Sequence, residues 1–91
     1  MIYDLREACK ITERLLRRND LTHHPFDTFV EILEFFDQVG PKFDESLRSS
    51  GRAMIERLGG VVQQRASRLD EGFPTSRANQ ALDRFGTFMN G

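Results

Sequence analysis

Apolar residues recur at helical spacing along almost the whole chain, and no segment alternates apolar and polar residues as a half-buried strand would. Residues 4–18 are the clearest case, because their small and apolar side chains return every three or four positions on one stripe: Leu5, Ala8, Cys9, Thr12, Leu15 and Leu16. Asp4 and Glu7 near the start, and arginines near the end, suit the helix dipole. This segment is therefore predicted to be a helix.

A second helix is predicted over residues 25–39, with Pro25 in its first turn. Apolar residues cover most of its circumference and leave only a thin polar stripe: Asp27, Glu31, Glu34 and Gln38. A helix so largely apolar is normally central and is packed on more than one side. Gly40 is expected to cap it in the left-handed conformation, and Pro41 to prevent its continuation.

Pro41 can also open a third helix, which the pair Gly59–Gly60 is expected to break or bend. The apolar period continues across the two glycines as far as Leu69. One kinked helix over residues 42–69 is therefore the alternative to two separate helices.

Residues 70–76 have the composition of a loop, in which Thr75 or Ser76 caps a last helix. That helix carries an apolar stripe from Ala78 to Met89. The chain is thus predicted to be all-α, a compact bundle of four or five short helices in a single domain of residues 1–91.

Composition narrows the class of protein. At 91 residues, 38% hydrophobic and 30% charged, the chain is too apolar for a disordered tail and too charged for a membrane protein. It has no apolar run of about 20 residues, and charge directly follows its N-terminus. We therefore expect neither a membrane span nor a signal peptide, and a cytoplasmic location.

No arrangement of residues predicts catalysis. General acid–base chemistry needs converging titratable groups, whereas His23 and His24 are neighbours in one loop with Asp20 as the nearby acid. Cys9 lies on the apolar stripe of the first helix, which predicts a buried and unreactive thiol, and one cysteine cannot close an intramolecular disulfide. No histidine or cysteine set has zinc spacing. We expect a protein that is not an enzyme and that needs neither a metal nor a cofactor.

The stretch from Ile55 to Leu69 contains the glycine pair, with apolar residues before and after it. Polar residues follow the second apolar segment. This stretch resembles a DNA-binding helix-turn-helix motif, with Gly60 in the turn and three packing positions: Val61, Ala66 and Leu69. The resemblance implies an exposed face of residue types that contact bases and phosphates: Gln63, Gln64, Arg65 and Arg68. It departs from the motif at Glu56, where alanine is usual. A DNA-binding regulator is therefore the alternative function.

Charge is distributed unevenly along the chain. Residues 19–45 carry seven acids and one base, whereas residues 46–69 carry five arginines and one acid. Such polarity can steer a charged partner, join two copies of the chain, or match two neighbouring helices to each other.

The leading interpretation is a regulator or assembly subunit that binds a partner protein and forms a homodimer. Eight of the nine aromatic residues are phenylalanine, and five of them lie between positions 26 and 43. These rings form a Phe-rich core, or they give the second helix more apolar surface than a small bundle covers, so that part of it meets another chain. The second possibility predicts these partner-binding residues: Asp27, Phe29, Glu31, Glu34 and Phe36.

Overall fold

The computed structural model describes residues 4–18, 24–68 and 76–90. The helices are α1 (Leu5–Arg17), α2 (His24–Val39), α3 (Glu45–Ala66) and α4 (Ser76–Asn90), with a 3₁₀ turn, η1 (Gly40–Lys42), after α2. Within these ranges no residue is in a strand. The prediction of an all-α bundle is confirmed, with four helices. The predicted loop over residues 70–76 and the proposed cap Thr75 lie outside the described part of the chain.

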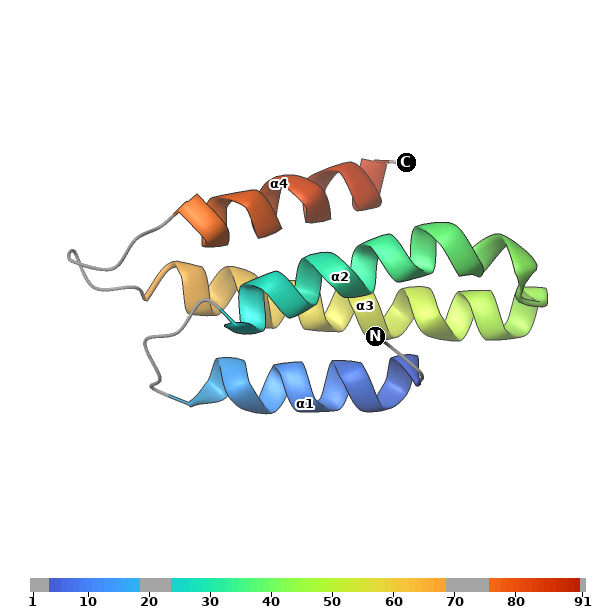
Figure 1. The fold of residues 1–91 in the computed structure, drawn as a ribbon, viewed down its shortest axis with the longest axis horizontal. Coiled ribbons are helices and arrows are strands. Elements are labelled where there is room, and N and C mark those ends of the chain that lie inside the picture. The colour runs from blue at the N-terminus through green and yellow to red at the C-terminus, as the bar shows by residue number, and fades with distance from the viewer. Residues whose placement is uncertain (1–3, 19–23, 69–75, 91) are drawn as a thin grey trace.

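The four helices run alternately in opposite directions, and α1 and α4 lie on opposite sides of α2 and α3 (Figure 1). Each of these two outer helices packs against both α2 and α3. Because the directions alternate, α1 is parallel to α3, and α4 is parallel to α2. The helices of each parallel pair are in contact. The ends of α2 and α3 that η1 joins extend beyond the ends of α1 and α4. We call this extension, residues 37–50, the α2–α3 tip.

The core is built mainly from α2 and α3, as the largely apolar sequence of α2 predicts. The largest fully buried hydrophobic side chains come from these two helices: Phe26, Phe29, Ile32, Ile55, Leu58 and Val62. Phe85 of α4 meets Phe29 edge to face, with ring centroids 5.7 Å apart. The Phe-rich core is therefore present, and phenylalanine rings join α2 to α4.

Aspartates begin two of the helices. The Oδ1 atom of Asp4 accepts hydrogen bonds from the backbone N–H groups of Arg6 and Glu7, at 3.0 and 3.3 Å. Asp44 caps α3 in the same way by accepting from the N–H of Leu47 at 2.7 Å. The prediction that Pro41 opens the third helix is wrong, because this later cap sets its start.

Gly40 does not have the left-handed conformation expected of a cap, since no described glycine has a positive φ. The chain instead leaves α2 through η1, where Pro41 lies in the first turn and the N–H of Phe43 donates to the carbonyl of Gly40 at 3.0 Å. A tight turn of this kind needs no left-handed residue.

Gly59–Gly60 lies inside α3 and does not break it. The two glycines differ in their surroundings: a Cβ on Gly59 would come within 3.0 Å of three ring atoms of Phe85, whereas a Cβ on Gly60 would meet nothing within 4 Å. Gly59 thus lets the Phe85 ring lie directly on the backbone of α3. The predicted break is wrong because this packing, between residues far apart in sequence, holds the glycines in a helix.

None of the described helices combines the length and the apolar character needed to cross a membrane.

Candidate functional site

The two aromatic residues predicted to bind a partner are covered by the chain itself. Phe29 is 0% exposed and Phe36 is 8% exposed. Since α1, α3 and α4 all pack around α2, its apolar circumference is used within one molecule. The expected surplus of apolar surface on α2 is therefore corrected: Phe29 offers no surface to a partner, and Phe36 offers an edge.

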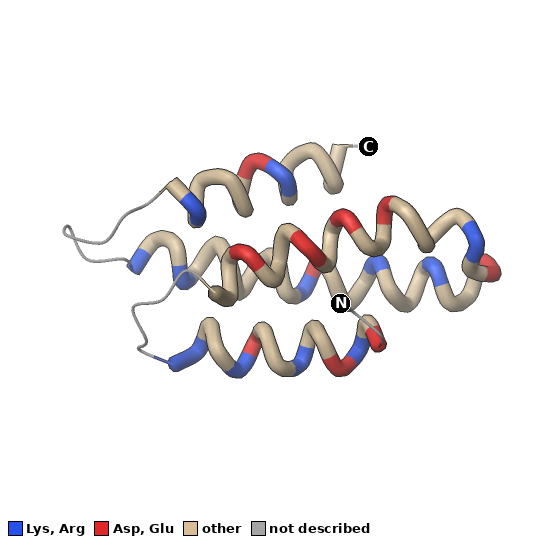
Figure 2. The backbone as a smooth tube through the Cα atoms, viewed as in Figure 1, with Lys and Arg blue, Asp and Glu red and all other residues tan. Residues whose placement is uncertain are grey.

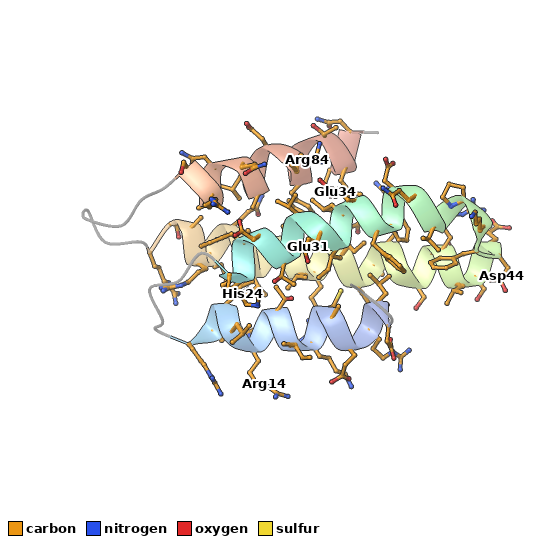
Figure 3. The ribbon with its side chains drawn as sticks, in the orientation of Figure 1. Arg14, His24, Glu31, Glu34, Asp44 and Arg84 are labelled. Carbon is orange, nitrogen blue, oxygen red and sulfur yellow. The ribbon has the colours of Figure 1, made fainter. Side chains whose placement is uncertain are left out.

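Two of the three acids predicted to bind a partner join α2 to α4. Asp27 pairs with Arg77 at an N–O distance of 2.7 Å. Glu34 pairs with Arg84 at the same distance (Figure 3). The acids are seven residues apart and so are the arginines, as expected of two parallel helices in register. Glu31 is exposed and makes no ion pair among the described residues. The acids of α2 form a row along the helix (Figure 2), and part of that row is neutralised by α4.

The helix-turn-helix interpretation is corrected by the continuity of α3. Residues 55–66 form a single helix without a turn at Gly60. The sequence predicts four residues on the base-reading face. Gln63, Gln64 and Arg68 are exposed, and Arg65 is half-buried. A recognition helix must be held at a large angle to the helix before it. One continuous helix does not provide that geometry.

A groove of about 380 Å³ opens beside the C-terminal half of α4, where α4 stops short of the α2–α3 tip. Its apolar surface comes from residues that are buried or partly buried, namely Leu33 and Phe36 of α2 and Phe88 of α4. The rings of Phe36 and Phe88 meet edge to face, with centroids 5.8 Å apart. Charged residues of three helices surround this apolar surface: Glu34, Asp37, Arg48, Arg52 and Arg84.

The charged residues around the groove divide into those that are paired and those that are not. Arg84 is bound by Glu34. Arg52 lies 4.7 Å from the centre of the Phe88 ring and 3.2 Å from the Oε1 atom of Glu56. In contrast, Asp37 on α2 and Arg48 on α3 are exposed, and neither makes an ion pair within the described ranges. The groove therefore has an unpaired acid on one wall and an unpaired base on the other.

Cys9 and His24, the residues considered above for catalysis, do not line the groove. Cys9 is 7% exposed, and burial, with a smaller contribution from the charge of Glu13, raises the pKa of its thiol to about 11. His24 is exposed at the first position of α2, whereas His23 is outside the described residues. The described residues hold no group of three side chains that could bind a metal ion. Cys9 thus remains protonated at neutral pH and is shielded from solvent.

The groove could not be found by sequence reasoning, because its walls come from segments as far apart as Leu33 and Phe88. One signal was present: Asp27 and Glu34 have the same seven-residue spacing as Arg77 and Arg84. That match would have placed α4 beside α2, and with it the end of α4 beside the tip.

No family model, curated protein or solved structure significantly matches the chain. Function must therefore be inferred from the geometry of the chain itself.

Proposed function

We propose that this protein is a non-enzymatic interaction module that binds a helix of a partner protein in the groove between α2, α3 and α4. The observation that carries the proposal is the groove itself, with an apolar surface and unpaired charges of opposite sign on its two walls. Recognition of an amphipathic helix uses these features, because apolar anchors enter the groove and charges at its edges set the orientation.

The way α4 is bound supports a helix as the occupant. Phe85 and Phe88 of α4 already pack on α2 and α3, with the Phe85 ring on Gly59 and the Phe88 ring beside Phe36. The groove continues this seat from the last turns of α4 toward Pro41. Side chains of α2 and α3 form ridges and grooves that repeat along each helix, and α4 packs into them. The same repeat continues past the end of α4, where a second helix can pack in the same way. The helix that it accepts has an apolar ridge, with a base facing Asp37 and an acid facing Arg48.

A synthetic helical peptide with a leucine ridge, lysines on one flank and glutamates on the other tests this function. It is titrated into the isotope-labelled protein, and backbone amide shifts are followed by NMR. We expect the shifts to cluster around Asp37, Arg48 and Thr87. Absence of shifts at millimolar peptide, or shifts centred on α1, would contradict the proposal.

A matched pair of variants on α4 gives the control. Thr87 lines the groove and is exposed, whereas Gln80 is exposed on the same helix and does not line it. Thr87→Trp should fill the groove and weaken peptide binding at least about tenfold, or about 1.4 kcal/mol. Gln80→Trp should leave the affinity unchanged. Equal affinities of the two variants would show that the peptide binds elsewhere.

A further inference from the structure

We propose that the groove is covered by the same surface of a second copy of the chain, so that two copies pair face to face about a two-fold axis running along the groove. This inference rests on the proposed function and names its partner. It follows from the placement of the two unpaired charges, Asp37 on α2 and Arg48 on α3.

These two residues lie at nearly the same level along the tip. A Cβ on Gly51 of α3 would be 2.9 Å from the Phe36 ring, so Phe36 of α2 and Gly51 face each other. Asp37 is one residue from Phe36, and Arg48 is three residues from Gly51. At about 1.5 Å of rise per residue, the two charges are within roughly one helical turn of each other.

A two-fold axis along the groove exchanges its walls. It places α2 of one copy against α3 of the other, so that Asp37 of each copy faces Arg48 of the other copy. The same contact forms twice, as in every isologous interface. A two-fold axis across the groove would instead set Asp37 against Asp37 and Arg48 against Arg48. Repulsion between like charges therefore selects the axis along the groove.

The groove also has apolar and aromatic groups for a second copy to cover. Pro41 of the tip lines the groove and is exposed, and Phe88 of α4 lines it and is only partly buried. The guanidinium of Arg52 lies over the Phe88 ring, with its Cζ atom 4.7 Å from the ring centroid, so its charge is held against an aromatic face of the groove. A stable dimer buries about 800 Å² on each chain. The chain exposes 6122 Å² in all, so the interface needs roughly an eighth of its surface.

Two variants, each with one of the two charges reversed, test whether Asp37 of one copy faces Arg48 of the other. Wild-type protein should have twice the chain mass of 10.5 kDa when measured by light scattering after size exclusion. Asp37→Arg alone sets the introduced arginine against Arg48 of the other copy, and Arg48→Asp alone sets the introduced aspartate against Asp37. Each variant should weaken the dimer at least about tenfold and elute as a monomer. An equimolar mixture of the two should restore a dimer, which native mass spectrometry identifies as the mixed species.

Glu31→Arg is the matched control, because Glu31 is exposed on α2, is unpaired within the described ranges and does not line the groove. It should dimerise as the wild type does. The inference is overturned if the wild-type protein stays monomeric at millimolar concentration, if the single variants dimerise normally, or if their mixture stays monomeric. Peptide binding that is sensitive to Thr87→Trp would in each of these cases preserve the proposed function. An intact dimer that binds no peptide supports the inference, because the second copy already covers the groove.

Discussion

Substituting the adjacent glycines of α3 separates helix propensity from packing. Alanine stabilises an exposed helix interior by about 0.5–1 kcal/mol relative to glycine, because glycine loses more backbone entropy on folding. Gly60 has open space where a Cβ would stand, so Gly60→Ala should receive this gain in full. Gly59→Ala receives the same gain, but its methyl group enters the space of the Phe85 ring.

The size of the penalty follows from the surroundings of that ring. To reach ordinary contact with the new methyl group, the ring must retreat by about 1.5 Å. Phe29 lies 5.7 Å from Phe85 and Phe88 lies 6.3 Å from it, measured between ring centroids, so the ring has little room. Overpacking of this kind costs about 1–3 kcal/mol. Since the propensity gain is common to both variants, Gly59→Ala should be less stable than Gly60→Ala by this amount.

Urea denaturation followed by far-UV circular dichroism measures the difference. For a domain of this size it corresponds to a gap in Tm of roughly 4–8 °C for each kcal/mol. Replacing Phe85 with leucine in the Gly59→Ala background should recover part of the loss, and a double-mutant cycle gives the coupling energy. Equal gains in stability for the two alanine variants would refute the packing of Phe85 on Gly59. Equal losses would indicate a turn at the glycines.

Three further outcomes are expected. Phe29→Ala should lower the free energy of unfolding by about 3–5 kcal/mol, because the ring is fully buried; unchanged stability with lost self-association would place Phe29 at an interface instead. The thiol of Cys9 has a pKa raised by burial to about 11, so its contribution is complete below the unfolded pKa near 9 and falls as the pH rises through 11. Wild type should therefore lose about 2–3 kcal/mol more than Cys9→Ala across this range in urea melts, and parallel pH profiles would disprove the shift. A double-mutant cycle with Glu34→Gln and Arg84→Gln should give a coupling of about 0.2–1 kcal/mol that vanishes in high salt, because both side chains are half exposed. A larger coupling that resists salt would mean that the pair is buried.

Local sequence signals predicted the parts of the fold that depend on neighbours in the chain. The stripe and the charges of residues 4–18 identified α1, and the structure adds that Asp4, predicted only to suit the helix dipole, also caps the helix. The nearly all-apolar sequence of α2 identified it as central. For α1 and α2, the spacing of apolar residues was sufficient to predict a buried helix, because any apolar helix could cover the apolar face.

The parts that were missed depend on contacts between distant residues. Gly59 and Gly60 have the same local propensity, and only the position of Phe85 distinguishes a glycine that is required from one that is not. The charge windows suggested that acids of α2 could match arginines of the following segment, but the ion pairs join them to Arg77 and Arg84 of α4. The groove was missed for the same reason, because it exists only where α4 ends beside the tip. The partner-binding role of the surface stays a prediction.

The arrangement of α1 and α4 on opposite sides of α2 and α3 determines how the native state can open. Each outer helix has its own seat, so detaching one does not remove the contacts of the other. Opening of α4 uncovers Phe29 and breaks the ion pairs of α2 while α1 keeps its place. We therefore expect α1 and α4 to open separately, and amide hydrogen exchange in the two helices to give two different opening free energies.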